Sequence, residues 1–398
     1  MKISIYSPGV CGSVGHALEY AVNICKNLNN KNSVYNLFTL VEKECLQKLT
    51  DNNINYDVSN KYKSGSINKK KFLKYGIFSS LIYGVYRIIY HYELINEFYT
   101  KNDKTELFYL FEFEYIAALI FFYKNKKYLK KTVLFFHSSD FCWVDKRPLS
   151  INIYKSILKF FLPYLVNNSF KSTVHGDFLK HELINNLGIK NENKVLSIPY
   201  GCNEYKQTLS KKDARIKLKL NKDIQYGLFF GVLREDKGIL ELIYSLSKMN
   251  SKINLIIAGS EGDVKKSNII EKIRILNLQE RVAINIKYLS EEEITLYYIA
   301  SDFIFITHKS YHVAFSGPLS LAVEYRRPVI ATNSGEIGQF VKKYKIGVTY
   351  ESDNWNNLVE VSNNYFENKN NIFDFDLALY ENSWENMTNK ILTIGNTQ

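Results

Sequence analysis

The stretch that decides the fold covers residues 301–341 and reads SDFIFITHKSYHVAFSGPLSLAVEYRRPVIATNSGEIGQFV. Its pattern predicts, in order, a strand, a loop, a helix, a second strand, a loop and the start of a second helix. The first strand is expected at residues 303–307, a short apolar run with β-branched residues, which is typical of a parallel strand buried on both faces. The helix is expected at residues 319–326, and the second strand begins at Pro328. Alternation of this kind predicts an α/β fold.

The loop before the predicted helix ends in Ser316, Gly317, Pro318 and Leu319. Ser316 or Gly317 can cap the helix, and Pro318 suits its first turn, where a missing N–H costs nothing. We expect free N–H groups at Gly317, Leu319 and Ser320, with the positive end of the helix dipole behind them, and hence an anion site. Because the loop follows a strand, it should lie at the carboxyl edge of the sheet, where open α/β folds bind ligands. An ordinary helix start without a ligand is the alternative.

Length and charge indicate two domains with different surfaces. The chain has 398 residues, 46% of them hydrophobic, which is enough for two full cores. The formal net charge is +12, and the lysine-rich segments without acids, residues 61–74 and 124–131, lie in the first half. Residues 351–385 are strongly acidic by comparison. The basic surface is therefore expected on the first domain.

Cysteine usage and hydropathy predict a cytoplasmic protein. The five cysteines are scattered and form no CxxC pair, so neither a zinc site nor a disulfide framework is expected. The apolar run at the start of the chain is too short for the core of a signal peptide. The most apolar window, residues 72–92, is interrupted by Lys74, Arg87 and His91 and does not predict a membrane span.

The start of the chain has a Rossmann-like pattern. A strand at residues 2–6 is followed by a turn with Gly9, Gly12 and Gly15, and then by a helix at residues 16–29. The glycine spacing does not match the dinucleotide fingerprint, and no acidic residue follows where the ribose would need one, so an NAD site is not expected. The glycines can still let a ligand approach the backbone.

A histidine follows one of the next strands. Strands are expected at residues 107–111 and 132–136, and His137 and Asp140 come after the second. At the carboxyl end of a parallel strand these side chains can orient a hydroxyl group or take a proton. A histidine bonded to neighbouring backbone is the alternative.

The pattern restarts after a polar, lysine-rich linker at residues 202–221. The elements expected there are a strand at 225–231, a helix at 239–249 and a strand at 253–259. Two successive blocks of this kind predict two Rossmann-like lobes that face each other. Arg234 and Lys237, in the first loop of the second block, would be cations beside the anion site, although isolated loop charges are usually solvated.

Together these motifs resemble the retaining GT-B glycosyltransferases of the family-four type, the glycosyl transferases group 1. The resemblance covers residues 195–341 well and the first 190 residues only in outline. The segments that carry it are Ile198 to Gly201 (IPYG), Phe229 to Gly238 (FFGVLREDKG), Ala258-Gly259, Ala300 to Asp302, Ser310, Ser316 to Ala331 and Gly335. The resemblance implies an α/β GT-B fold with two lobes across a cleft. The domains expected are an acceptor-binding lobe at residues 1–201, a nucleotide-sugar-binding lobe at 202–370 and a C-terminal helix at 371–398 that packs back on the first lobe.

The resemblance also implies roles for particular residues. Lys237 and Arg234 match the cationic pair that grips the donor diphosphate, although the commoner arginine position of the family is Val232 here. The catalytic residues implied are His137, Lys237 and Arg234. The donor-binding residues implied are Gly12, Gly15, Gly231, Ser316, Gly317, Pro318, Leu319 and Glu324.

The chain departs from the family pattern at two glutamates. These would fall on Val313 and Leu321, neither of which can hydrogen-bond a sugar or a ribose. The Ser-Gly loop resembles a variant branch that lacks the first glutamate. Glu324, one turn beyond Leu321, is expected to reach the ribose, and a surface glutamate is the alternative.

The function implied is that of a retaining hexosyltransferase. It would move a sugar from a nucleotide diphosphate donor, UDP- or GDP-linked, to a saccharide or lipid-linked acceptor in surface polysaccharide synthesis, without a cofactor or an essential metal. A nucleotide-sugar epimerase of the same fold is the second enzyme hypothesis. A basic nucleic-acid-binding protein is the third, but charge in two clusters without a recognition helix is weak support for it, and no nucleic acid partner is expected.

The two lysine segments predict a further partner. Both adjoin aromatic runs, residues 72–92 and 115–123. Lysines beside exposed aromatic rings suit an anionic membrane surface, so we expect peripheral, salt-sensitive attachment to the inner face of the cytoplasmic membrane. Core helices with solvated lysines are the alternative.

Overall fold

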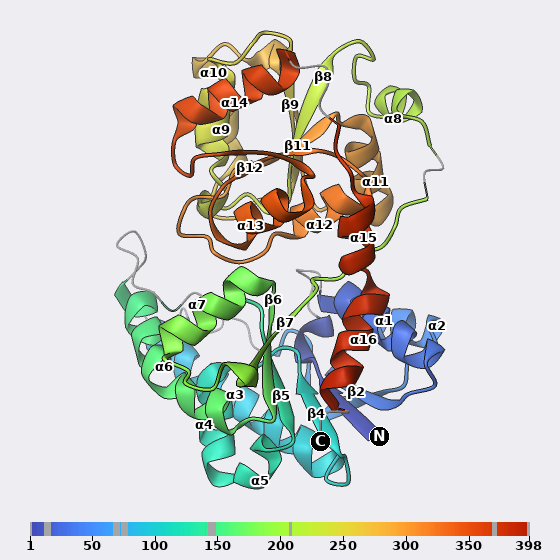
Figure 1. Ribbon diagram of the computed structural model, residues 1–398, viewed down its shortest axis with the longest axis vertical. Helices are drawn as coiled ribbons and strands as arrows, with labels where there is room; N and C mark the ends of the chain where they lie inside the picture. Colours follow the sequence, from blue (N-terminus) through green and yellow to red (C-terminus); the bar gives the residue numbers. More distant parts are fainter. Residues whose placement is uncertain are drawn as a thin grey trace. The chain divides into compact units, whose positions relative to one another are not determined.

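The structure is a computed structural model that describes residues 2–11, 17–66, 72, 79–139, 141, 149–206, 209–367 and 372–395. The chain divides into two compact units (Figure 1). Unit 1 consists of Met1–Pro199 and Trp384–Gln398, and unit 2 consists of Tyr200–Ser383. Both units alternate strands and helices, as the sequence predicts.

Unit 1 is built on a seven-stranded sheet in the order β3-β2-β1-β4-β5-β6-β7, and neighbouring strands pair in parallel. The strands are β1 (Lys2–Tyr6), β2 (Val34–Val41), β3 (Tyr56–Lys63), β4 (Leu107–Leu110), β5 (Thr132–Phe136), β6 (Lys171–His175) and β7 (Val195–Ile198). Strands β4 and β5 are buried at every residue, because helices cover both of their faces. The order reverses between β1 and β4, which makes that edge the switch point of the sheet.

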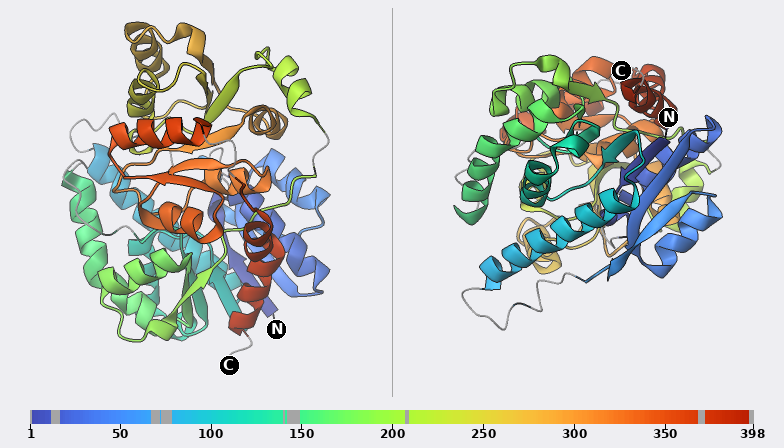
Figure 2. Two further views of the ribbon diagram at one scale, coloured as in Figure 1. Left: turned by 45° about the horizontal axis from the view of Figure 1, so that its top comes forward. Right: turned by 90° about the horizontal axis from the view of Figure 1, so that it is seen from below.

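The helices of unit 1 form layers on its sheet (Figure 2). They are α1 (Ala17–Asn30), α2 (Lys43–Asp51), α3 (Ser79–Lys101), α4 (Tyr115–Lys124), α5 (Lys126–Leu129), α6 (Leu149–Asn168), α7 (Asp177–Leu187) and α16 (Trp384–Gly395), with the short 3-10 segments η1 (Pro8–Cys11) and η3 (Glu192–Lys194). Helix α3 packs on α4, α4 on α6 and α6 on α7, whereas α16 packs on α1. The Tyr109 hydroxyl of β4 donates to the Ile391 carbonyl at 2.8 Å, which ties the end of the chain to the first sheet.

Unit 2 has a six-stranded parallel sheet in the order β10-β9-β8-β11-β12-β13. Its strands are β8 (Gln225–Phe230), β9 (Ile253–Gly259), β10 (Val282–Ile286), β11 (Phe303–Ile306), β12 (Val329–Thr332) and β13 (Gly347–Tyr350). Its helices are α8 (Lys211–Lys217), α9 (Ile239–Leu246), α10 (Lys266–Ile275), α11 (Glu291–Ala300), α12 (Gly317–Glu324), α13 (Gly335–Tyr344), α14 (Trp355–Glu367) and α15 (Asp376–Glu381), with η4 (Glu235–Lys237) and η5 (Gln279–Arg281). The order reverses between β8 and β11, so the loops after these two strands meet at the switch point.

The two parallel sheets confirm the predicted α/β class. The sequence pattern did not predict β2, β3, β10 and β13, in part because edge strands carry polar side chains. Strand β3, for example, reads YDVSNKYK and buries one residue, Ser59. The predicted linker contains a helix, α8, whose N-terminus is capped by the Ser210 hydroxyl. The single helix expected at residues 371–398 is replaced by two, and the first of them, α15, belongs to unit 2 and packs on α12.

The cysteines differ in part from the sequence-based expectation. Cys45, at the start of α2, is disulfide-bonded, which the scattered cysteines did not lead us to expect. Cys25 and Cys202 are buried free thiols. Spacing along the chain does not show which cysteines a fold brings together, and this is why the sequence failed here.

Candidate functional site

The site of unit 2 lies where the loops after β8 and β11 meet. The Thr307 hydroxyl donates to the Lys237 carbonyl at 2.8 Å, and the Lys309 N–H donates to the Asp236 carbonyl at 2.8 Å. These two bonds join the η4 segment to the loop that leads to α12. The backbone of η4 is therefore fixed, and the position of the Lys237 side chain follows from it.

Lys237 places a buried ammonium group over Gly231. A Cβ atom on Gly231 would lie 2.6 Å from Lys237 Nζ and 3.8 Å from Pro318 Cγ, and the φ angle of Gly231 is +113°. Lys237 is 8% exposed, and burial, followed by the nearby charge of Arg234, lowers its pKa to about 8. Among the described residues, Nζ has neither a hydrogen bond nor an ion pair. A buried cation without a partner is costly, so this position favours an anionic ligand.

The start of α12 lies beside this ammonium group. Ser316 is 3% exposed, and its hydroxyl has no hydrogen bond within the described part of the chain. The N–H groups of Leu319 and Ser320 donate to the Ser316 carbonyl, at 2.9 and 3.3 Å. The expectation that both were free is therefore wrong, because the first turn closes on its own cap residue. The Gly317 N–H has no acceptor among the described residues and remains available to a ligand.

Arg234 is held by a carboxylate of its own loop. Its Nε and Nη2 donate to the two Asp236 carboxylate oxygens, at 2.8 Å each, and His312 Nδ1 donates to the second of these oxygens at 3.0 Å. Burial alone would raise the pKa of Asp236, but the hydrogen bonds from His312 and Arg234 hold it well below its usual range. Arg234 is therefore not an isolated solvated charge, although its side chain is 46% exposed.

Two histidines that the sequence analysis did not single out lie next to these residues. The rings of His308 and His312 have centroids 4.3 Å apart, and His308 is 3% exposed. Burial, followed by the charges of His312 and Lys237, lowers the pKa of His308 well below its usual value. His308 Nδ1 and His312 Nε2 have no partner within the described residues. The sequence feature that could have identified them is a pair of histidines four residues apart, between a predicted strand and Ser316.

The loop from β11 to α12 rests on the start of α13. A Cβ atom on Gly335, whose φ is +62°, would lie 2.9 Å from Val313 Cα, and the Glu336 N–H donates to the Val313 carbonyl at 3.0 Å. Val313 thus holds the loop through its backbone. Leu321, the other position of the absent glutamates, packs against the core of unit 2.

Glu324 is the last residue of α12, about two turns from Pro318. It is half-buried, and its carbonyl accepts from the Tyr205 N–H at 3.3 Å. The pKa of the Cys202 thiol is raised to about 12, first by burial and then by the charge of Glu324. The role of Glu324 at the ribose stays a prediction.

In unit 1, His137 lies at the carboxyl end of β5, as predicted. Its Nε2 donates to the Phe111 carbonyl at 2.7 Å, so it has the backbone partner that the alternative interpretation required. Its ring packs near His175 and against Tyr20, with centroid distances of 5.3 and 5.7 Å. His137 is nevertheless exposed, so its ring can also contact a ligand.

Three other residues predicted for the site in unit 1 lie outside the described residues: Gly12, Gly15 and Asp140. Glu112, which the sequence analysis did not consider, follows β4 and has its carboxylate against Gly9, where a Cβ atom would come within 1.8 Å of an Oε atom. Burial raises the pKa of Glu112.

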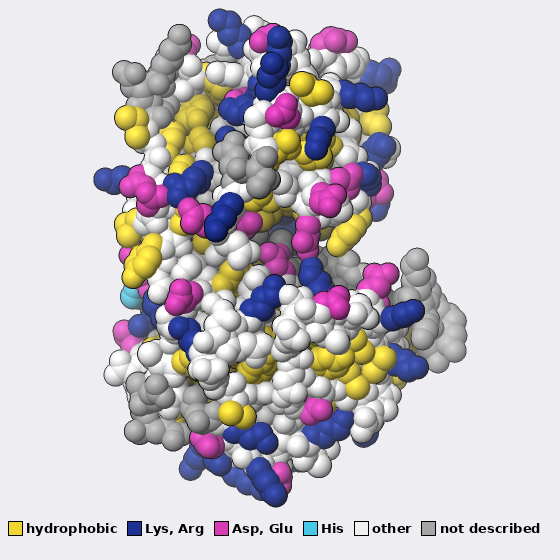
Figure 3. Space-filling model, turned by 90° about the vertical axis from the view of Figure 1, so that its right-hand side faces the viewer, with side chains coloured by type: hydrophobic (Ala, Val, Ile, Leu, Met, Phe, Trp, Pro, Cys, Tyr) yellow, Lys and Arg dark blue, Asp and Glu magenta, His cyan; other side chains and the backbone are white. Residues whose placement is uncertain are grey.

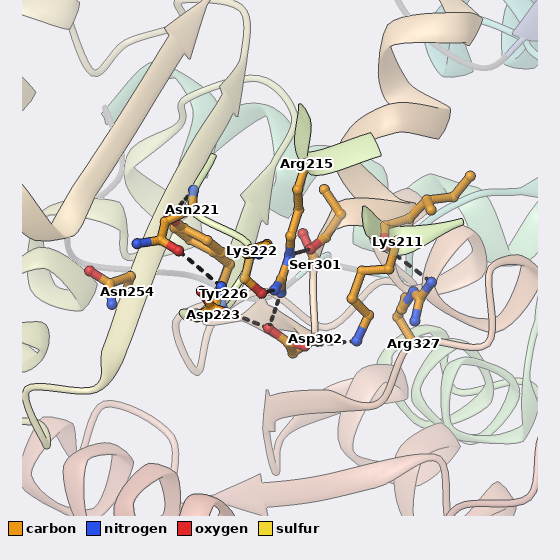
Figure 4. Close-up of polar contacts among 12 residues, drawn as sticks. Lys211, Arg215, Asn221, Lys222, Asp223, Tyr226, Asn254, Ser301, Asp302 and Arg327 are labelled. Atoms are coloured by element: carbon orange, nitrogen blue, oxygen red, sulfur yellow. Dashed lines mark hydrogen bonds and ion pairs between the residues drawn. The ribbon is translucent and has the colours of Figure 1, made fainter. Parts of the chain in front are cut away.

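Asp302, which belongs to the motif pattern, has a structural role. Its carboxylate accepts from Lys211 Nζ at 2.8 Å, from Arg215 Nη2 at 2.7 Å and from the Tyr226 N–H at 2.7 Å (Figure 4). These contacts join α8 and the start of β8 to the start of β11. Because the candidate site lies at the other end of these parallel strands, Asp302 stabilises unit 2 without touching a ligand there.

Comparison with known proteins supports the assignment of unit 2. Residues 210–383 match the family model described as "Glycosyl transferases group 1". No curated protein sequence matches this chain. The matched segment lies within unit 2 and includes Gly231, Lys237 and the Ser316-Gly317 loop.

Solved structures resemble the chain over its whole length. A glycosyltransferase from Rickettsia africae is 18% identical, with a TM-score of 0.71 and coverage of 99% of this chain and 97% of that one. HepE from Anabaena in complex with UDP is 14% identical, with a TM-score of 0.70 and full coverage of both chains. Sucrose-phosphate synthase from Thermosynechococcus elongatus is 15% identical, with a TM-score of 0.69 and coverage of 100% and 98%. At these identities the likeness shows the fold. The chain thus has the α/β fold of the GT-B glycosyltransferases, and residues 210–383 of its second unit match the model of the glycosyl transferases group 1.

Proposed function

We propose that this protein transfers a sugar from a nucleotide diphosphate donor to a saccharide or lipid-linked acceptor, with retention. The observation that carries the proposal is the Lys237 ammonium group, which is buried over Gly231 at the start of α12 and has no partner among the described residues. A phosphate group supplies the charge that such a position lacks.

The same residues suit the charge that develops in the reaction. Breaking the bond between sugar and diphosphate leaves negative charge on the diphosphate. Lys237 and the Gly317 N–H can stabilise that charge, and fixed donors of this kind contribute about 2.7 to 4 kcal/mol each in other enzymes. Arg234 can add a further N–H donor, although Asp236 compensates its charge. With attack on the same face of the sugar, the leaving diphosphate can accept the proton of the acceptor hydroxyl. His137 is assigned to the sugar-binding side of this reaction.

The donor we favour is UDP-linked. The Anabaena protein HepE has been solved with UDP and with UDP-glucose, and other structural neighbours act in lipopolysaccharide synthesis: the galactosyltransferase WaaB and the glycosyltransferase WaaG. These proteins resemble the chain at low sequence identity, so they suggest the first compounds to test. Surface polysaccharide synthesis is the process we propose on the same ground.

A thermal-shift panel tests the donor class. We expect one nucleotide, UDP before GDP, to raise the melting temperature together with its sugar derivatives, since a ligand at about 100 times its Kd adds roughly 2.7 kcal/mol. Stabilisation by oligonucleotides and by no nucleotide sugar would contradict the proposal and favour nucleic acid binding. Conversion of the donor to another sugar isomer in the absence of any acceptor would favour the epimerase.

The acceptor side of the proposal includes an anionic membrane surface. Helix α6 carries exposed apolar side chains at a spacing of three to four residues, which places them on one face: Leu149, Ile153, Ile157 and Phe160. Helix α3 has a similar exposed group, Leu81, Val85 and Ile89. Arg87 of α3 lies over the Tyr154 ring of α6 at 5.9 Å, so the two helices are neighbours. No helix within the described residues is long and apolar enough to cross a membrane.

Lysines give this surface the charge that an anionic membrane attracts. The five lysines of residues 124–131 are all exposed. Figure 3, which faces the side of unit 1 opposite α6, shows lysine and arginine side chains at its lower end, the end at which Figure 1 places α5. The aromatic run at residues 115–123 is a different case, because α4 buries Phe121 and Phe122. The larger exposed apolar groups belong to α6 and α3, although Ile120 and Tyr123 of α4 are exposed as well. The basic segment covers the end of α4 and α5, which packs on α4.

Vesicle sedimentation tests the membrane surface. We expect the protein to bind anionic vesicles at low salt and to be released at high salt, because each lysine near the surface contributes about 1 kcal/mol. Phe160, which is 79% exposed, should contribute by burial, so Phe160→Ser should weaken binding about tenfold. The control is Tyr288→Ser, since Tyr288 is a comparably exposed ring in unit 2, at 78%. Equal binding to neutral vesicles, or equal loss in both variants, would contradict the assignment.

A further inference from the structure

Charges in the candidate site do not match the ligand that the site is proposed to bind. Arg234 and Asp236 form a salt bridge through two bonds of 2.8 Å each, so together they are neutral. Lys237 is then the one uncompensated cation of the η4 segment. The diphosphate of a nucleotide sugar carries more than one negative charge, so a second cation would improve the match.

We propose that His312, positioned by Asp236, binds the donor diphosphate through its Nε2–H and supplies this second positive charge. The inference rests on the proposed function, because it assigns a further residue to the same site. His312 lies in the loop between β11 and α12, with its side chain 15% exposed. Nothing in the family pattern described above assigns a role to this position.

The hydrogen bonds of His312 determine which ring nitrogen can reach a ligand. Asp236 is ionised and can only accept, so the proton on that side of the ring is on Nδ1, which donates at 3.0 Å. Nε2 is buried and has no partner among the described residues. In neutral His312 this nitrogen is an acceptor and would repel a phosphate oxygen, whereas in protonated His312 it is a donor. Anion binding and protonation of His312 therefore favour each other.

Other orphan polar atoms lie in the same segment. Within the part of the chain that the structure describes, the buried hydroxyl of Ser316, four residues after His312, has no partner, and neither has His308 Nδ1. Several unsatisfied buried groups in one loop indicate an absent ligand more strongly than one such group would. His308 is unsuited to the cationic role, because burial lowers its pKa well below the usual value and it stays neutral.

Charged and titratable groups lie on every element that packs around His312. From η4 and the residue before it come Arg234, Asp236 and Lys237, and the pKa of Lys237 is about 8. From its own loop come His308 and Lys309, and Lys309 is paired with Glu241 at 2.8 Å and Glu235 at 3.7 Å. From α13 comes Glu336, and from the loop after β13 comes Asp353, which accepts from the Ser310 hydroxyl at 2.5 Å. Of this set, Lys237 loses its charge as the pH rises through about 8.

Nucleotide affinity measured against pH tests the inference. The probe is UDP, or GDP if UDP does not bind, titrated calorimetrically at about pH 6 and about pH 8 into the whole protein. We expect the affinity of the wild type to rise as the pH falls, by several-fold more than the affinity of His312→Gln. Glutamine keeps a hydrogen-bond donor but cannot carry the charge. The ionisation of the nucleotide and that of Lys237 are common to both proteins and cancel in the comparison.

Asp236→Asn provides an independent second variant. Removal of the carboxylate should make His312 harder to protonate, so the rise in affinity should begin at a lower pH than in the wild type. An unchanged pH profile in Asp236→Asn, or equal profiles in wild type and His312→Gln, would overturn the inference while nucleotide binding itself stands. Failure of the wild type to bind any nucleotide at either pH would instead overturn the proposed function.

Discussion

Replacement of Lys237 by alanine is expected to weaken the binding of the donor and of the free nucleoside diphosphate alike, by roughly ten- to a hundredfold. A hydrogen bond to a charged group contributes about 1.5 to 3 kcal/mol, and the upper part of that range applies because Lys237 is buried. The loss should be the same for donor and nucleotide because both present the diphosphate to this ammonium group. The measurement is isothermal titration of UDP and of a nucleotide sugar.

Two comparisons strengthen the Lys237 experiment. In the wild type, affinity should be present below pH 8 and fall as the pH rises through about 8, since Lys237 loses its charge there, and Lys237→Ala should lack this fall. Lys211→Ala serves as the control, because Lys211 pairs with Asp302 at the opposite end of the strands. Unchanged nucleotide affinity in Lys237→Ala would refute the assignment of the diphosphate site.

Gly317→Val is expected to abolish sugar transfer while unit 2 stays folded. Gly317 is the first residue of α12, its N–H lacks an acceptor within the described residues, and a branched side chain there would obstruct a phosphate group. Valine would also directly precede Pro318. A side chain before proline disfavours helical φ/ψ angles, so the loop backbone would shift. Transfer rate and nucleotide affinity measure the effect, and circular dichroism and thermal melting measure folding.

The control for this variant is Gly84→Val. Gly84 lies in α3, and a Cβ atom there meets no atom of the described residues within 4 Å. This substitution should therefore leave nucleotide affinity unchanged and report only the general effect of replacing glycine by valine. If the Gly317→Val variant transferred sugar as fast as the wild type, the Ser316-Gly317 segment would start a helix without binding phosphate.

Local pattern was sufficient for the four central strands of unit 2 and for α12, because these are governed by short-range physics. β9 and β11 are buried at every residue, and such strands appear in the sequence as continuous apolar runs. The boundaries of α12 were also accessible, since Pro318 in the first turn and Pro328 after the helix limit where it can run. Edge strands such as β3 could not be recognised in this way, because a strand with polar side chains on both faces has no apolar pattern.

Such local patterns could not predict the contacts inside the candidate site. Asp236 and His312 are 76 residues apart in the sequence, and they meet because β8 and β11 are neighbours in the sheet. The sequence placed Lys237 beside the Ser316-Gly317 loop through a resemblance, but it did not show that the ammonium group is buried over Gly231. It also predicted free N–H groups at Leu319 and Ser320, which the first turn of α12 satisfies.

The sequence by itself determined the α/β class, the two Rossmann-like blocks and the glycosyl transferases group 1 motifs, since apolar periodicity, helix caps and glycine positions are encoded within a few residues of one another. The tertiary structure decided which loops meet at the carboxyl edge of the second sheet. It also decided that Asp236 pairs with Arg234 and orients His312, and that α4 buries Phe121 and Phe122 whereas α6 presents a row of apolar side chains to solvent. The physical reason is the same in each case: strand order and helix packing determine which side chains lose water together, and neither is written in the local pattern of the chain.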